Sequence, residues 1–193
     1  MRNGTGSCSV SAGFLLLAAF LFYVDGTVIL LAGFAAFLHE LGHCMVLSLL
    51  GGRVEALRIT VIGAELKLDR TKPLSYPKEF AVALSGPLVS LLAAWVSARL
   101  GCFLFAGLSL ALGVFNLLPV WVLDGGRALY AATAGLTHEV LAAKLTYRAS
   151  CLTIAALVGL GIGTLVRYGN LTLLLTALWL LSGAVAGQTR RRR

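Results

Sequence analysis

The chain has 193 residues, of which 59% are hydrophobic and only 12% are charged. Soluble domains carry about a quarter charged residues, so this composition excludes an ordinary soluble protein. It predicts an all-α polytopic membrane protein in which residues 1–193 form a single domain.

Apolar runs, taken in chain order, predict about six transmembrane helices, because a spanning helix needs about 20 apolar residues. The runs are Ser9–Val24, Thr27–Leu50, Phe80–Ala98, Cys102–Leu118, Leu145–Val166 and Leu171–Ala186. Only Asp25 and Gly26 separate the first two runs, which predicts a tight helical hairpin there. The first run also resembles a signal peptide in length. However, Arg2 is the only basic residue before it and no small-residue cleavage site follows, which favours a retained helix.

Basic residues are distributed unevenly in this topology. Of the 16 Lys and Arg residues, 14 fall on the side that carries both termini, and only Arg99 and Arg167 fall on the other. Cytoplasmic loops carry the excess of positive charge, so the pattern predicts a multi-pass cell-membrane protein with both termini in the cytoplasm. The net charge of +8 therefore needs no nucleic-acid partner. We interpret the basic tail, residues 189–193, as a topology anchor that could also contact anionic lipid or a partner.

The second apolar run contains the motif H-E-x-x-H at residues 39–43 and no other charged residue. Residues four apart share one face of a helix, so His39 and His43 can bind the same metal ion. Glu40 lies about 100° around the helix from His39, where it can act on a water without ligating the metal. Charged groups at membrane depth cost a few kcal/mol unless they are paired or liganded. A catalytic zinc ion, one per chain, explains their presence.

A catalytic zinc needs three protein ligands and one open position, so a third ligand is expected elsewhere. His138 lies in a polar stretch that is typical of a loop or a helix end, which disfavours it. Asp124 closes the fourth apolar run, and it reaches the depth of His43 only if the chain after Pro119 folds back. Pro119 and the pair Gly125-Gly126 supply the helix breakers for such a fold.

These motifs resemble the site-2 protease family of intramembrane zinc metalloproteases, nearest to the branch of the sporulation factor IVFB proteases. The matching segments are H-E-L-G-H at 39–43, S-G-P at 85–87 and N-x-x-P…D-G at 116–125. The resemblance implies that His39, His43 and Asp124 are zinc ligands and that Glu40 is the catalytic base. It also places Asn116 near the bound peptide. Residues 120–123 lack the second proline that is common in the family, which leaves the path of the chain to Asp124 open.

Residues 51–72 have a different pattern, in which apolar and polar side chains alternate on both sides of Gly63. A period of two predicts a small β-hairpin, and its charged residues place it at the cytoplasmic interface. Its edge, around Ile59, could accept a substrate strand. The alternative is that the hairpin only covers the site.

The sequence therefore predicts an intramembrane zinc endopeptidase that hydrolyses membrane-tethered proteins within or near the bilayer. The resemblance extends this to the release of a transcription or sigma factor. The expected partners are a membrane-protein substrate and the lipid bilayer, and the oligomeric state stays open. One alternative is a membrane protein that binds zinc but does not cut. Another is a small transporter, which the lack of a second H-E-x-x-H helix disfavours.

Overall fold

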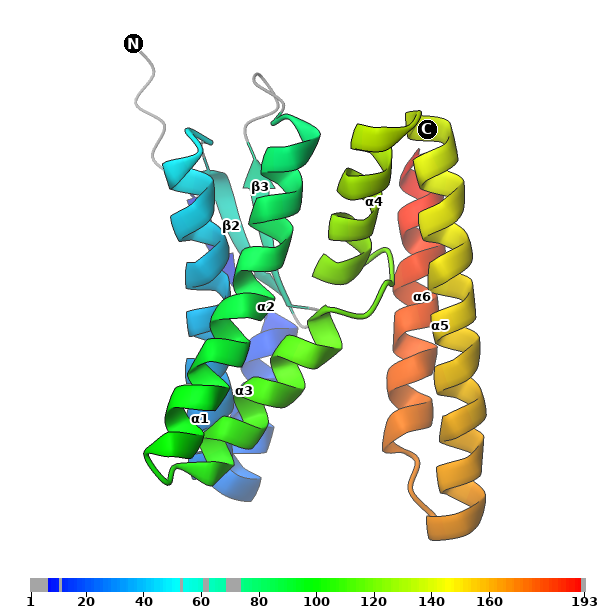
Figure 1. The fold of residues 1–193 in the computed structure, drawn as a ribbon. Helices are drawn as coiled ribbons and strands as arrows, with labels where there is room; N and C mark the ends of the chain where they lie inside the picture. The colour runs from blue at the N-terminus through cyan, green and yellow to red at the C-terminus, as the bar shows by residue number, and fades with distance from the viewer. Residues whose placement is uncertain (1–6, 11, 53, 61–62, 69–73, 192–193) are drawn as a thin grey trace. The chain divides into compact units, whose positions relative to one another are not determined.

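The computed structural model describes residues 7–10, 12–52, 54–60, 63–68 and 74–191 (Figure 1). In chain order the elements are β1 (Ser7–Val10), α1 (Ala12–Leu49), β2 (Val54–Thr60), β3 (Gly63–Leu68), α2 (Tyr76–Arg99), α3 (Phe103–Asn116), α4 (Asp124–Leu136), α5 (Glu139–Tyr168) and α6 (Thr172–Arg191). The chain divides into two compact units. The first unit is Met1–Lys78 with Ser85–Val114, and the second is Glu79–Leu84 with Phe115–Arg193.

The N-terminal helix differs from the prediction. The expected helical hairpin at Asp25 and Gly26 is wrong, because α1 is one continuous helix of 38 residues. Glycine inside a helix costs only about 1 kcal/mol relative to alanine, and a single Asp-Gly pair does not outweigh a long apolar run on each side. Strand β1, Ser7–Val10, takes up the first two residues of the predicted run Ser9–Val24. At 1.5 Å per residue α1 is about 57 Å long, longer than the roughly 30 Å core of a bilayer.

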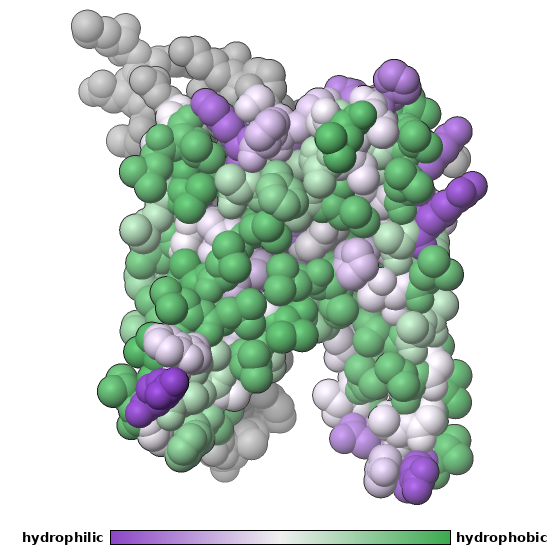
Figure 2. All heavy atoms as spheres, in the orientation of Figure 1, coloured by the Kyte–Doolittle hydropathy of each residue, from purple (hydrophilic) through white to green (hydrophobic). Residues whose placement is uncertain are grey.

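The other four predicted runs coincide with α2, α3, α5 and α6, and the all-α class is confirmed. Within the described residues, three helical segments are long and apolar enough to cross a membrane: Gly26–Leu49, Tyr76–Arg99 and Glu139–Tyr168. Shorter apolar helices lie at Phe103–Asn116 and Thr172–Ala184. Figure 2 shows hydrophobic residues over most of the visible helix surfaces, with hydrophilic residues gathered near helix ends. Such surfaces suit contact with lipid.

The strands form a three-stranded sheet in the order β1-β2-β3. β2 and β3 pair antiparallel, from Val54 opposite Leu68 to Thr60 opposite Gly63, where the alternating pattern places a hairpin. β1 pairs parallel to β2, with Val10 opposite Ile59. β2 is therefore the central strand. The prediction that Ile59 lies at a free strand edge is wrong, because β1, a strand of only four residues, pairs with β2 along that edge.

In the first unit, α1 and the later part of α2 approach closely at Gly42. A Cβ at this position would lie 2.9 Å from the carbonyl oxygen of Ser85 and 2.9 Å from Cγ2 of Val89. Such distances leave no room for a side chain, so glycine allows the two helices to pack with backbone near backbone. This approach brings the residues of α2 next to His39 and His43 of α1.

In the second unit, the buried apolar cluster is built around the segment that precedes α4. Val120 and Leu123, from that segment, pack with Ile154 of α5 and Leu180 of α6. Val120 and Leu180 are fully buried. The core of this unit therefore anchors the short chain segment that leads to Asp124.

Candidate metal centre

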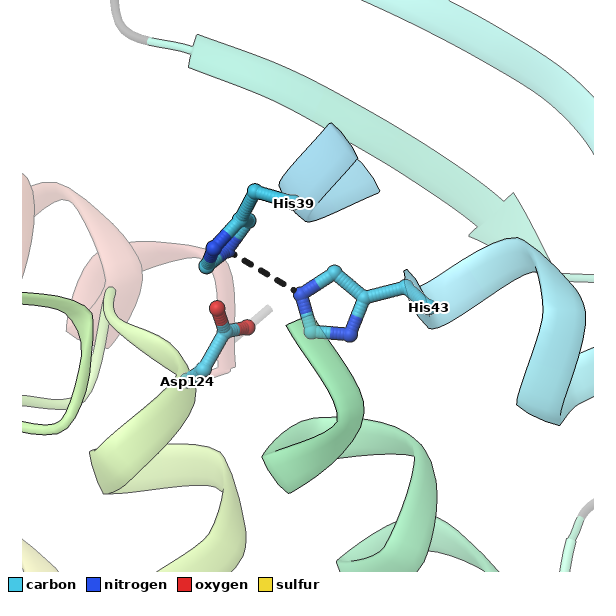
Figure 3. Close-up of side chains that lie close together, drawn as sticks. All are labelled: His39, His43 and Asp124. Atoms are coloured by element: carbon cyan, nitrogen blue, oxygen red, sulfur yellow. Dashed lines mark hydrogen bonds between the residues drawn. The ribbon is translucent and has the colours of Figure 1, made fainter. Parts of the chain in front are cut away.

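The two histidines of the H-E-x-x-H motif lie on successive turns of α1 and are almost fully buried, with 4% and 3% of their surface exposed. Their rings meet edge to face, and Nε2 of His39 lies 3.3 Å from Nε2 of His43 (Figure 3). Two nitrogens bound to one tetrahedral zinc at 2.0–2.1 Å lie about 3.4 Å apart. The spacing of the two Nε2 atoms therefore fits a pair of ligands to one ion.

The other nitrogen of each imidazole faces a serine hydroxyl of α2. Nδ1 of His39 lies 2.9 Å from Oγ of Ser90, and Nδ1 of His43 lies 3.4 Å from Oγ of Ser85. When each Nδ1–H donates to its serine, both Nε2 atoms present lone pairs that point toward each other. A cation between the rings satisfies both lone pairs, so the donor set fits a metal ion.

Gly86 leaves the space that the ring of His43 occupies. A Cβ at Gly86 would overlap that imidazole, and the nearest atoms include Cε1 at 2.6 Å. Gly86 follows Ser85 directly, so one turn of α2 both contacts the ring through a hydroxyl and makes room for it. The segment S-G-P at 85–87 thus contributes directly to the histidine environment.

Glu40 lies next to His39 on α1 and is half-buried. A helix turns about 100° per residue, so the carboxylate is carried on a different face from the two imidazoles. Glu40 is therefore next to the histidines in sequence, but it does not lie on the helix face that carries both imidazoles.

Asp124 is the first residue of α4 and is 8% exposed. One of its carboxylate oxygens, Oδ1, lies 3.4 Å from Nη1 of Arg127, one turn later. A negative charge in the first turn of a helix also interacts favourably with the positive end of the helix dipole. Arg127 and the start of α4 thus both place positive charge beside this carboxylate.

The chain before Asp124 folds back in two tight turns. Val120 N–H donates to the carbonyl oxygen of Leu118 at 2.7 Å, and Leu123 N–H donates to that of Val120 at 2.8 Å. A Cβ on Gly125 would lie 2.6 Å from the carbonyl oxygen of Leu118. The predicted break after Pro119 is present, and the first α4 glycine is required because the returning chain lies against it.

Ser150 of α5 holds this turn segment from the side. Trp121 N–H donates to Ser150 Oγ at 2.9 Å. The same hydroxyl lies 3.2 Å from the carbonyl oxygen of Pro119 and 2.8 Å from that of Thr146. A segment without regular backbone bonds must satisfy its polar groups by other means, and Ser150 accepts a hydrogen bond from one of them here.

Comparisons with known proteins found similarity to metalloproteases. Residues 101–160 match the model of peptidase family M50. The chain is 31% identical over 166 residues to a zinc metalloprotease of Methanocaldococcus jannaschii, covering 76% of this chain and 45% of that protein. It is 30% identical over 102 residues to stage IV sporulation protein FB of Bacillus subtilis, covering 48% of this chain and 35% of that one. The chain thus spans less than half the length of these curated relatives.

The structure aligns with the site-2 protease from Methanocaldococcus jannaschii with a TM-score of 0.68 and 24% identity, covering 90% of this chain and 85% of that one. The chain has a site-2 protease fold. The resemblance predicted from the motifs is therefore confirmed. The M50 match contains Asn116 and Asp124, whereas the H-E-x-x-H motif lies outside it.

The remaining predicted residues are placed as follows. Asn116 is the last residue of α3 and is half-buried, and its role near a bound peptide stays a prediction. His138, the disfavoured ligand, is exposed and precedes the first residue of α5. Ile59 lies in the central strand, as described above. Arg192 and Arg193 of the basic tail, and residues 53, 61–62 and 69–72 of the predicted hairpin, lie outside the described residues.

Sequence reasoning missed the three serines that support the site: Ser85, Ser90 and Ser150. The S-G-P motif indicated only a resemblance to the family, without a role for the hydroxyl of Ser85. The available signal was the presence of hydroxyls inside apolar runs, but most such hydroxyls bond to their own helix backbone. These serines differ from other serines in apolar helices because they contact groups on another segment. Those contacts depend on the packing of α1 against α2 and of the turn segment against α5, which the sequence alone does not give.

Proposed function

We propose that this chain is an intramembrane zinc endopeptidase that hydrolyses peptide bonds of membrane-tethered proteins. One observation carries the proposal: two buried imidazoles from an H-E-x-x-H helix direct their Nε2 atoms at each other, 3.3 Å apart. The relatives of this chain include a zinc metalloprotease, which supports zinc as the metal. A carboxylate beside the pair, Glu40, supplies the group that hydrolysis needs.

The proposed third ligand is Asp124. The proposed ligand set is thus the three side chains drawn in Figure 3, which are His39, His43 and Asp124. Two histidines and one carboxylate form a catalytic zinc set that leaves the fourth position open. The two units then act as one metalloprotease domain with one zinc per chain.

When bound, zinc supplies Lewis acidity, which makes a water more acidic and polarises the carbonyl of the scissile peptide. Glu40 accepts the proton of the attacking water and passes it to the leaving amine. His39, His43 and Asp124 fix the position at which this proton transfer takes place. The substrate must be extended at the cleavage point, because a helix ties its carbonyls into its own hydrogen bonds.

The substrate class follows from the surface of the protein. Its candidate spans and exposed apolar side chains suit a bilayer, so a membrane protein is the substrate that can reach buried ligands. A stage IV sporulation protein is among its relatives, which supports the proposal that the substrate is a tethered precursor of a transcription or sigma factor.

Charged residues support a cytoplasmic location for the active-site end of α1. Arg99 and Arg167 lie in the last turns of α2 and α5. The guanidinium carbon of Arg99 lies 5.5 Å from the ring centroid of Trp95, and that of Arg167 lies 5.9 Å from the ring centroid of Tyr168. Aromatic residues with neighbouring arginines are typical of a membrane interface. We therefore propose that the C-terminus is cytoplasmic. The N-terminus was expected on the same side because two spans were predicted before residue 51. Since α1 is one continuous helix, that reason no longer applies.

The test is cleavage of a helical transmembrane substrate by the purified full-length chain, with and without a zinc chelator. We expect cleavage that the chelator abolishes and that added zinc restores. A preparation that holds zinc but never cuts would favour the alternative of a zinc-binding membrane protein. Chelator-resistant cleavage would contradict the proposed metal mechanism.

A further inference from the structure

Two hydroxyls of α2 face the imidazoles of α1, and they carry an inference that rests on the proposed function. We infer that Ser90, and to a smaller extent Ser85, are positioning residues. They hold His39 and His43 in the tautomer and ring orientation in which Nε2 is available to zinc.

The geometry of the two contacts supports this role. His39 contacts Ser90 and His43 contacts Ser85, so the order of the partners along α2 is the reverse of the order along α1. Four residues of α1 rise about 6 Å and five residues of α2 rise about 7.5 Å, so antiparallel helices can match both pairs. Residues five apart on a helix point about 140° apart. The two contacts are therefore not equivalent: the shorter, 2.9 Å, is at Ser90 and the longer, 3.4 Å, is at Ser85.

Burial makes the Ser90 contact effective. Ser90 is 1% exposed and His39 is 4% exposed, so bulk water cannot easily replace the hydroxyl as a partner of Nδ1. A neutral imidazole carries one proton, on either nitrogen. A hydroxyl that accepts from Nδ1–H places that proton on Nδ1 and leaves the Nε2 lone pair free.

A hydroxyl also suits the location. In soluble zinc sites the partner of a ligating histidine is often a carboxylate. A further carboxylate on an apolar helix at membrane depth would cost a few kcal/mol. Serine orients the ring without adding a charge to the span Tyr76–Arg99.

Ser109 of α3 provides a matched control. It is as buried as Ser90, at 1% exposure, but its hydroxyl has no hydrogen-bond partner within the part of the chain that the structure describes. Replacing Ser109 with alanine removes the same atoms from a similar environment without affecting a histidine.

The experiment measures the zinc affinity of the purified full-length chain in detergent by competition with a chelator. Ser90→Thr and Ser90→Val have nearly the same volume, so any packing strain is shared and only the hydroxyl differs between them. We expect Ser90→Val and Ser90→Ala to bind zinc about 10- to 100-fold more weakly than wild type, the usual effect of losing a partner of a metal ligand. Ser90→Thr should restore most of the affinity, and Ser109→Ala should bind as wild type does.

Equal zinc affinities for Ser90→Thr and Ser90→Val would overturn the inference, because the hydroxyl would then have no role. Wild-type affinity in Ser90→Ala would overturn it as well. Either result, with zinc still bound by wild type, would leave the proposed function intact. A wild-type chain that binds no zinc would instead refute the proposed function, and the inference with it.

Discussion

The proposed zinc ligands of the two units, the histidine pair and Asp124, are held in different ways. In the first unit the histidines are on a regular helix, and two serine hydroxyls and Gly86 of a second helix set their rings. In the second unit Asp124 follows an irregular turn segment, which backbone hydrogen bonds, one serine and a buried apolar cluster fix in place. The first half depends on side-chain orientation, and the second depends on the path of the main chain.

This difference determines which mutations should damage each half. A substitution in the first half should act through one imidazole. A substitution in the second half should act on the backbone that presents the carboxylate. The experiments below separate these two routes, from the largest expected effect to the smallest.

The largest expected effect is that of Asp124→Ala. Two imidazoles alone hold zinc weakly, so the loss of the third ligand should abolish cleavage. Zinc affinity should fall by more than about 100-fold, which is the upper end of the effect of losing a hydrogen-bond partner of a metal ligand. Zinc content after dialysis and turnover of a transmembrane substrate check this. The matched control is His138→Ala, at an exposed position, which should change neither. Loss of zinc in His138→Ala but not in Asp124→Ala would show that the ligand set is wrong.

Gly86→Ala should come next, because the new methyl group would overlap the ring of His43. We expect most of the zinc to be lost while the helices still form, since alanine favours a helix by about 1 kcal/mol over glycine. Gly107→Ala on α3, where a Cβ meets nothing within 4 Å, is the control and should retain full zinc content. Circular dichroism checks the helices. Normal zinc affinity in Gly86→Ala would contradict the close approach of α2 to His43.

Ser150→Ala should have a smaller effect. It removes the hydrogen bond from Trp121 N–H to the hydroxyl, and a hydrogen bond contributes about 0.5–1.5 kcal/mol to stability. The turn segment should loosen and zinc affinity should fall by roughly tenfold, as chelator competition would show. Thr164→Ala on the same helix is the control, because the hydroxyl of Thr164 bonds to carbonyls of Gly161 and Asn170, away from the turn. Equal affinities in the two variants would mean that Ser150 does not support the site.

The same contrast explains what the sequence could predict. The spacing of His39 and His43 translates directly into geometry, because a helix repeats every 3.6 residues. The break before α4 was predictable as well, since proline is not tolerated in the interior of a helix. The prediction that Gly125 and Gly126 act as helix breakers is wrong, because both lie in the first turn of α4. The hydrogen bonds of the turn to Ser150 were not, because they depend on which helix packs beside it.

The errors have the same origin. Asp25 and Gly26 suggested a turn, but local breakers yield to long apolar segments that stay helical, and α1 continues through them. Ile59 was assigned to a strand edge because only residues near it in sequence were considered, whereas β1 pairs with it from 49 residues away. The serines beside the histidines lie 42 and 51 residues from their partners. Non-local pairing of this kind leaves little trace in a single sequence.

The measurement that tests the central claim most directly compares wild type with Glu40→Gln in metal content and turnover on the same preparations. If Glu40 is the base and His39, His43 and Asp124 hold the metal, the variant should keep one zinc per chain and lose cleavage of a transmembrane substrate. Substantial remaining turnover would remove Glu40 from the mechanism, and loss of zinc would show that Glu40 belongs to the metal site itself. Either result would contradict the account.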